Sequence, residues 1–145
     1  MRNVDKSEFG EMILTYQDNA MNLPGYKKKS FLLYYNGGEI WFEHLDGIYE
    51  NEGLVIQKLN KDIPLFSRPS STSFICFVFG ETIVTDNIFL AVKKAVLESK
   101  KGFKKIAFCG LDRKKQKKFK KSFVNHGFEI GFFEGLEDAK QWLLP

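Results

Sequence analysis

The chain has 145 residues, of which 43% are apolar and 28% charged, and its formal net charge is +4. This composition excludes wholesale disorder, a collagen-like repeat and a disulfide-stapled scaffold, and it suits one globular domain. No apolar run reaches the roughly 18 residues that span a bilayer, and the charged N-terminus lacks the apolar core of a secretory signal. We therefore expect a cytoplasmic protein without stable membrane insertion.

The first part of the chain carries few structural signals. Residues 1–29 are interpreted as an N-terminal arm, and residues 30–145 are expected to form an α/β domain. Within the arm, Met12–Tyr16 is compatible with a short strand or with one helical turn, and Asn22–Gly25 is typical of a turn.

A β-hairpin is predicted directly after the arm. Two β-prone runs, Phe31–Tyr35 and Glu39–Leu45, flank the turn residues 36–38, Asn-Gly-Gly. Asn-Gly between apolar runs favours a hairpin, because its turn requires the positive φ angles that Asn and Gly adopt readily. His44, near the end of the second run, is interpreted as a surface or strand-edge residue rather than a catalyst.

Helices and buried strands should alternate after the hairpin. A first helix is predicted over residues 51–63, ended by Pro64, whose missing N–H disfavours a helix interior. The continuous apolar run Phe74–Phe79 predicts a central strand that is covered on both faces. The next helix should carry an inward stripe at helical spacing, formed by Ile88, Ala91, Val92, Ala95 and Val96.

The last part of the chain continues the alternation. Lys105–Cys109 is predicted as a buried strand, and Asp112 should cap a helix that ends at Gly127. A strand over 128–133 and a helix over 136–144 complete the order. The expected fold is therefore α/β, with a mixed, mostly parallel sheet of about five strands and about four helices.

The sequence contains no recognisable catalytic or metal-binding motif. Cys76 and Cys109 lie in buried-strand patterns and are interpreted as small apolar core residues in a reducing compartment. A metal site needs clustered Cys and His, but the two histidines, His44 and His126, stand far apart in the sequence, so we expect no metal and no cofactor. Without a Gly-rich phosphate loop or a nucleophile elbow, the chain is expected not to be an enzyme. A carboxylate-based site stays open, because the sequence does not display which carboxylates meet in space.

Charge is segregated along the chain. Residues 93–121 hold 13 of the 22 basic residues and two acids, a local net charge of +11, whereas the rest of the chain carries −7. Such a basic block favours an anionic partner, although solvated helix faces would look the same. The alternative function is nonspecific binding of a nucleic-acid backbone, through Lys104, Lys105, Arg113, Lys114, Lys117, Lys118 and Lys121. A membrane surface suits this block less well, because its apolar face is narrow.

The order of elements over Phe31–Leu144 resembles the STAS domain, which sulphate transporter tails share with bacterial anti-sigma-factor antagonists. Three stretches carry the resemblance. Residues 38–47 match a strand and the Gly/Leu-Asp turn after it, residues 74–92 match the central strand and second helix, and residues 128–139 match the last strand and an acidic-capped closing helix. The resemblance implies a non-catalytic regulatory domain that binds a protein partner.

In the antagonists of this family, a Ser in an Asp-Ser-Ser/Thr-Gly motif opens the second helix, and a partner kinase phosphorylates it to release the complex. The matching stretch here, Thr85-Asp86-Asn87-Ile88, lacks Ser-Ser-Gly. Two functional hypotheses follow. Asp86 acts as a fixed negative charge that imitates the modified state, or Thr85 is the acceptor. Any of Thr85, Asp86 and Asn87 can cap the helix, and the structural alternative to both hypotheses is that Asp86 is simply this cap.

Ligands of open α/β sheets favour the carboxyl ends of the strands. We therefore expect Thr85, Asp86, Asn87 and Asp112 to form one partner-binding edge. The two aspartates should make this edge acidic, which disfavours a phosphate ligand and favours a basic groove on a protein partner.

Overall fold

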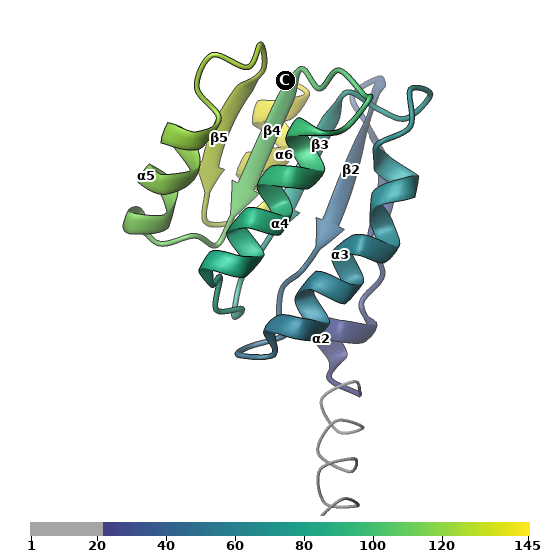
Figure 1. The fold of residues 1–145 in the computed structure, drawn as a ribbon. Coiled ribbons are helices and arrows are strands. Elements are labelled where there is room, and N and C mark those ends of the chain that lie inside the picture. Colours follow the sequence, from purple (N-terminus) through teal and green to yellow (C-terminus); the bar gives the residue numbers. More distant parts are fainter. Residues whose placement is uncertain (1–21) are drawn as a thin grey trace, which may run out of the picture.

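The computed structural model describes residues 22–145, which form a five-stranded sheet with helices on both faces (Figure 1). The strands lie side by side in chain order. The first two pair antiparallel and the other neighbours pair parallel, so the sheet is mixed and mostly parallel, as the sequence predicts. The strands are β1 (Phe31–Tyr35), β2 (Gly38–His44), β3 (Phe74–Val78), β4 (Lys105–Cys109) and β5 (Glu129–Phe133). The helices are α2 (Pro24–Lys27), α3 (Glu52–Phe66), α4 (Asp86–Leu97), α5 (Arg113–Ser122) and α6 (Leu136–Leu143).

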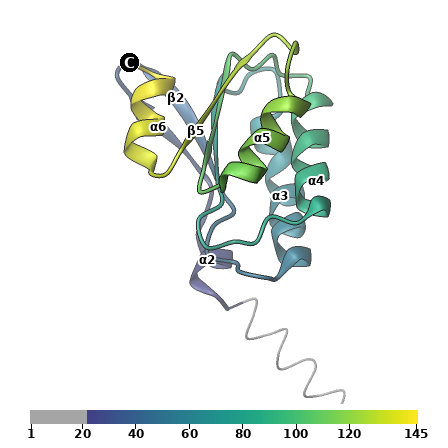
Figure 2. The same cartoon turned by 90° about the vertical axis from the view of Figure 1, so that its left-hand side faces the viewer.

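Three helices cover one face of the sheet and one helix covers the other. α3, α4 and α5 lie together, whereas α6 lies on the opposite side (Figure 2). Each of the first three connects one parallel strand to the next. Right-handed crossovers made in one direction along a sheet place their helices on the same face. α6 follows the last strand and folds back over β3, β4 and β5.

Phenylalanine is the commonest residue on the larger side of the core. The ring centroids of Phe77 and Phe108, on neighbouring strands, lie 5.6 Å apart. Phe119 of α5 meets Phe108 at 5.0 Å and Phe89 of α4 at 4.9 Å, both edge to face. These rings join the sheet to two of its helices, and edge-to-face pairs add attraction beyond the area that they bury.

The smaller side of the core lies beneath α6. There Cys76 and Cys109 are buried free cysteines on paired strands, and their sulfur atoms are 3.5 Å apart. Ala139 and Leu143 of α6 pack over them. β3 is therefore buried on both faces, which confirms the prediction from its continuous apolar run.

α3 extends past its predicted end. The sequence predicts a stop at Pro64, but the helix continues to Phe66, which is buried in the core. Pro64 lacks the N–H that would bond the carbonyl of Asn60. Because Asn60 is exposed, water can satisfy that carbonyl, and the cost of continuing the helix is small.

α5 ends before its predicted boundary. The sequence predicts an end at Gly127, but the last helical residue is Ser122, followed by the buried Phe123. Asn125 and Gly127 then adopt positive φ angles of 65° and 85°. These two residues turn the chain back toward β5, so Gly127 belongs to the connection rather than to the helix end.

Residues 22–29 of the predicted arm pack against the domain. Pro24–Lys27 form a one-turn helix where the sequence predicts a turn. Lys58 of α3 donates a hydrogen bond to the Gly25 carbonyl at 3.3 Å. A Cβ atom on Gly25 would lie 2.3 Å from the Gly47 carbonyl oxygen, so only glycine allows this close approach. The predicted element at Met12–Tyr16 lies outside the described residues.

Candidate functional site

The loops that follow β2 and β3 are joined to each other at the carboxyl edge of the sheet. Backbone hydrogen bonds run from Gly47 N–H to the Gly80 carbonyl at 2.8 Å and from Tyr49 N–H to the Glu81 carbonyl at 3.0 Å. A third bond returns from Ile83 N–H to the Tyr49 carbonyl at 2.9 Å. The two loops therefore form an extension of the parallel sheet rather than separate free loops.

The side chain of Thr82 fastens this junction. Its hydroxyl donates to the Leu45 carbonyl at 2.6 Å and accepts from Ile48 N–H at 3.0 Å. Tyr49 and Glu81 hold positive φ angles of 55° and 56°, which non-glycine residues adopt only when their surroundings impose them. The loop conformation is thus fixed by many hydrogen bonds before any partner binds.

Large apolar side chains are exposed on and beside this junction. Tyr49 and Ile83 are 45% and 56% exposed on the joined loops, and Leu90, on α4, is 54% exposed. Leu90 lies one helical turn beyond Asp86 and Asn87. We call these five residues the carboxyl-edge surface. Tyr49 and Ile83 combine apolar exposure with a backbone that hydrogen bonds hold in place, which suits a binding role.

Thr85, rather than Asp86 or Asn87, caps α4. Its hydroxyl oxygen accepts a hydrogen bond from Ile88 N–H at 3.3 Å and donates to a carboxylate oxygen of Glu52. The other oxygen of Glu52 accepts from Asn87 Nδ2 at 3.3 Å. Glu52, in the first turn of α3, therefore links the starts of two neighbouring helices.

Asp86 projects into solvent at the start of α4, where its side chain is 87% exposed. It pairs with Lys118 of α5, whose ammonium group also lies 4.6 Å from the ring centre of Phe89. The hydrogen bond from Lys118 lowers the pKa of Asp86, so this carboxylate is charged at neutral pH. The structure thus joins the predicted acidic edge to the predicted basic block.

Asp112 caps α5, as the sequence predicts. It accepts from Lys115 N–H at 2.8 Å and pairs with the Lys115 ammonium at 3.3 Å. Between the starts of α4 and α5 lies a hollow of about 320 Å³, lined by Thr85, Asp86 and lysines 114, 115 and 118 among others. The hollow is therefore more basic than the sequence suggests, because each aspartate at this edge is paired with a lysine.

The predicted basic residues divide between two parts of the molecule. Arg113, Lys114, Lys117, Lys118 and Lys121 all belong to α5 and are exposed. The other two, Lys104 and Lys105, lie at the start of β4. The start of this strand is at the end of the sheet opposite to the carboxyl edge.

Lys105 faces away from α5. Its ammonium group donates to the Trp142 carbonyl at 2.9 Å and lies 4.9 Å from the centre of that indole ring, beneath α6. Lys104 is exposed and lines a different hollow, with Glu129. Lys105 therefore does not share a surface with the lysines of α5, and it serves to hold α6.

A polar cluster beneath α3 is not anticipated by the sequence analysis. Glu43 is fully buried, and one of its carboxyl oxygens accepts from the Trp41 indole N–H at 2.9 Å. Its other oxygen and Asp62 Oδ2 are buried without a donor among residues 22–145. Burial, and then the neighbouring Asp62 carboxyl, raise the pKa of Glu43 to about 9.

Lys58 and His44 complete this cluster. The ammonium group of Lys58 donates to the His44 carbonyl, and burial lowers the pKa of this lysine. His44 is buried, not on the surface as its position suggests, and its Nδ1 lies 2.8 Å from Asp46 Oδ1. Burial alone would raise the pKa of Asp46, but hydrogen bonds from His44 and Lys28 outweigh it and lower the pKa to about 2.

The buried cluster lies apart from the hollows of the surface. Glu43 and Asp62 are the kind of carboxyl pair that acid–base catalysis uses, but Glu43 is sealed from solvent, and neither residue lines the hollows described here. A sequence signal does exist, because Glu43 is an acid inside an otherwise apolar run. In a half-buried strand, side chains alternate between core and solvent, and an acid is expected on the solvent side. This expectation is wrong for Glu43, because both faces of β2 are covered.

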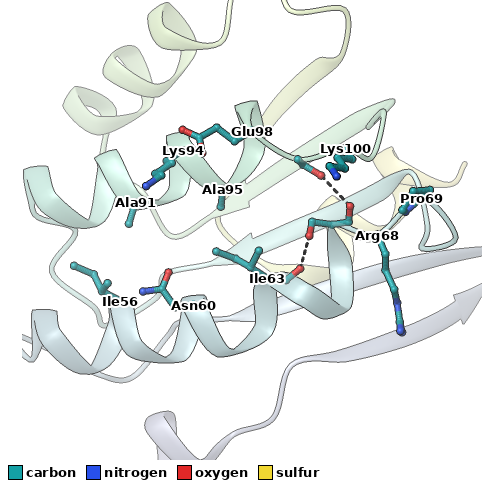
Figure 3. A pocket seen from close by; sticks show the side chains of 12 residues that line it. Ile56, Asn60, Ile63, Arg68, Pro69, Ala91, Lys94, Ala95, Glu98 and Lys100 are labelled. Carbon is teal, nitrogen blue, oxygen red and sulfur yellow. Dashed lines mark hydrogen bonds between the residues drawn. The ribbon is translucent and has the colours of Figure 1, made fainter.

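A groove of about 640 Å³ lies between α3 and α4 (Figure 3). Its apolar lining includes Ile56, Ile63 and Ala95, with Lys94 and Glu98 on its charged side. None of the predicted site residues lines it.

The chain matches no protein-family model, and comparisons with curated proteins and with solved structures return no match. Among residues 22–145, no helix is both long and apolar enough to cross a membrane. The same residues contain no group of three or more His, Cys, Asp or Glu side chains that could hold a metal ion.

Proposed function

We propose that this chain is a non-catalytic regulatory domain, similar to the STAS antagonists, that binds a protein partner through its carboxyl-edge surface. The observation that carries this proposal is the pair of hydrogen-bonded loops that exposes Tyr49 and Ile83 beside Asp86. Exposed aromatic and aliphatic side chains that are fixed in advance lose little conformational entropy on binding, which favours affinity.

Charge indicates the chemistry of the partner. Glu50 and Glu81 are exposed beside Tyr49 and Ile83, whereas Asp86, at the other end of this surface, is paired with Lys118. An apolar contact with an acidic border suits a partner that offers apolar pockets bordered by Lys or Arg. We expect the complex to form in the cytoplasm.

Between the two hypotheses for the start of α4, the contacts favour Asp86 as a fixed charge. The Thr85 hydroxyl is only partly exposed and is already engaged with Ile88 N–H and Glu52. A phosphate at Thr85 would have to displace both contacts and would lie beside the Glu52 carboxylate. Asp86, in contrast, is exposed and charged without any modification.

The experiment is a capture of partners by the tagged full-length chain from nuclease-treated lysate of the native organism. Three variants are compared with wild type: Ile83→Asp and Asp86→Lys on the carboxyl-edge surface, and Val124→Asp as a control. Val124 follows α5, away from this surface, and is as exposed as Ile83. We expect a discrete protein that wild type and the control retain and that both edge variants lose. Capture at wild-type level by both edge variants would refute the assignment.

A second candidate function is binding of a nucleic-acid backbone by α5. Among residues 22–145, the ion pairs of α5 involve only Lys115 and Lys118, so the exposed Arg113, Lys114 and Lys117 are available to an anion. Such binding should weaken steeply with salt, because each neutralised phosphate releases counterion.

Fluorescence anisotropy with a labelled single-stranded RNA tests this second candidate. The variant Lys117→Glu/Lys121→Glu is compared with Lys61→Glu/Lys94→Glu, which makes the same charge change on exposed positions of α3 and α4. We expect the α5 variant alone to lose binding and to have a smaller salt dependence. Equal losses in the two variants would instead indicate a response to net charge and would exclude α5 as a specific site.

A further inference from the structure

Within residues 22–145, β1 is an edge strand without the usual protection against pairing. It lies at one end of the sheet order, and all five of its residues, Phe31–Tyr35, are apolar or aromatic. Natural edge strands are commonly protected by a charged side chain, a proline or a bulge. β1 contains neither charge nor proline, and it pairs with β2 in unbroken register.

The hairpin turn determines which backbone groups of β1 point outward. Asn36 and Gly37 both have positive φ, 47° and 82°, which defines the two-residue turn that the sequence predicts. The residues that flank such a turn, Tyr35 and Gly38, form a hydrogen-bonded pair, and hydrogen-bonded pairs recur at every second residue. The N–H and C=O groups of Leu32 and Tyr34 must therefore face away from β2.

Two hydrogen bonds confirm this alternation. His44 N–H donates to Ser30 Oγ at 2.9 Å, so even-numbered residues of β2 direct their backbone groups toward β1. The Glu39 carbonyl accepts from the Thr72 hydroxyl, and Thr72 lies two residues before the start of β3, so odd-numbered residues of β2 direct their backbone groups toward β3. The partners of Leu32 and Tyr34 are Trp41 and Glu39, both odd.

The outward edge is also apolar at its surface. Tyr34 is 73% exposed and Leu32 is 37% exposed, on the same side of the strand. The hydroxyl of Tyr34 hydrogen-bonds Glu39, which raises the pKa of this tyrosine. The aromatic ring nevertheless remains open to solvent.

We propose that two copies of this chain pair antiparallel through β1, with Leu33 of one copy opposite Leu33 of the other. In this register Leu32 of each copy lies opposite Tyr34 of the other. All four outward-facing N–H and C=O groups of each strand then form hydrogen bonds. Within Phe31–Tyr35, a shift by two residues in either direction leaves half of these groups without a partner in the opposing strand. The register is thus the one that satisfies the backbone of both copies.

Side chains and charges fit the same arrangement. The exposed Leu32 and Tyr34 of each copy would cover each other on one face of the joined sheet. Antiparallel pairing also brings the lysines before β1, at 27–29, toward the end of the partner strand where Glu39 lies. Because β1 itself has no charge, no like charges meet. The contact is short, so we expect a concentration-dependent dimer.

Cysteine cross-linking tests the register directly. Cα atoms of a directly opposed, non-hydrogen-bonded pair lie about 4.5 Å apart, which a disulfide can bridge, whereas equivalent residues away from the two-fold axis are too distant. Full-length Leu33→Cys should therefore form a disulfide-linked dimer under mild oxidation, and Leu32→Cys and Tyr34→Cys should not. Wild type is the control for the native cysteines, which are buried. Absence of the Leu33→Cys dimer, or equal cross-linking at all three positions, would overturn the proposal.

A charge exchange supplies a second test that introduces no cysteine. Leu32→Lys places a charge opposite Tyr34 of the other copy and should weaken the dimer about tenfold by analytical ultracentrifugation. Adding Tyr34→Glu to the same chain places Lys opposite Glu twice, and should restore the wild-type dissociation constant. Circular dichroism verifies the fold of each variant. A double variant weaker than Leu32→Lys alone, or a wild-type chain that stays monomeric at high concentration, would contradict the pairing.

Discussion

Beneath α3, Glu43 and Lys58 lie inside the core, whereas at the start of α4, Asp86 and Lys118 lie in solvent. Both clusters combine carboxyl groups with a lysine, but their surroundings have opposite effects on the protonation of the carboxyl groups. Burial holds a proton on Glu43, while solvent and Lys118 keep Asp86 charged. The first cluster can affect stability strongly, and the second is available to a partner.

The comparison shows that the role of a charged residue depends on the element that carries it. Glu43 is in the interior because β2 is covered by α3 on one face and by its strand neighbours at both edges. Asp86 is outside because a helix begins there and directs its first turn into solvent. If this account is correct, substitutions in the two clusters should separate cleanly into effects on stability and effects on binding.

The largest effect on stability is expected from Lys58→Met. This change leaves the carbonyls of His44 and Gly25 without their donor and removes the cation that offsets the nearby acids. The free energy of unfolding should fall by about 2–4 kcal/mol in urea denaturation. Lys61→Met, on the exposed side of the same helix, is the control. Equal losses of unfolding free energy in both variants would show that the buried Lys58 stabilises the fold no more than an exposed lysine does.

Glu43→Gln should change how stability depends on pH. Because the pKa of Glu43 rises from 4.5 to about 9 on folding, the folded state holds a proton that the unfolded state releases. Wild-type stability should therefore fall as the pH rises from about 5 to 9, by several kcal/mol at most. The glutamine variant keeps a neutral group and should flatten this dependence in urea titrations at a series of pH values. A control substitution at the exposed Glu134 to Gln should leave the slope as in wild type. If the stability of Glu43→Gln depended on pH as steeply as that of wild type, another titrating group would be responsible for the dependence.

A smaller effect is expected from Thr85→Ala, next to Asp86 at the start of α4. Loss of the hydroxyl removes the cap on α4 and the contact with Glu52, and should cost about 1 kcal/mol. Thr85→Ser keeps the oxygen and should retain most of that stability. The melting temperatures of Thr85→Ala and Thr85→Ser distinguish the contribution of the capping hydroxyl from that of the methyl group. Equal melting temperatures for the two variants would mean that the hydroxyl is not the source of stability.

The smallest effect on stability is expected from Asp86→Asn. An exposed ion pair contributes little, so the melting temperature should stay as in wild type. If Asp86 provides a fixed charge for a partner, this variant should nevertheless lose captured protein. A melting temperature that falls as far as that of Thr85→Ala would show that Asp86 is structural, and would break the distinction between the clusters.

Much of the fold could be predicted because its signals are local. Asn36-Gly37 specified the hairpin, and the apolar run at β3 indicated cover on both faces. Helix ends were less predictable. The helix expected to stop at Pro64 continues to Phe66, which is buried in the core, and the helix expected to end at Gly127 ends before Phe123, which is also buried.

The site was predictable in outline but not in its pairings. The element order placed Thr85 and Asp86 at the carboxyl edge, but residues 32 positions apart, Asp86 and Lys118, form an ion pair that no local pattern reveals. Tyr49 and Ile83 were missed because their exposure depends on how two loops join. Glu43 was missed because burial of an acid follows from tertiary contacts with α3.

The central claim is that the carboxyl-edge surface meets a protein partner. A photo-reactive phenylalanine analogue at position 83 of the full-length chain, expressed in the native organism, tests it most directly. The same analogue at position 124, which is equally exposed, is the comparison. We expect a single covalent adduct of defined mass from position 83 on illumination and none from position 124. Adducts from position 124 alone, or the same adducts from both positions, would contradict the account.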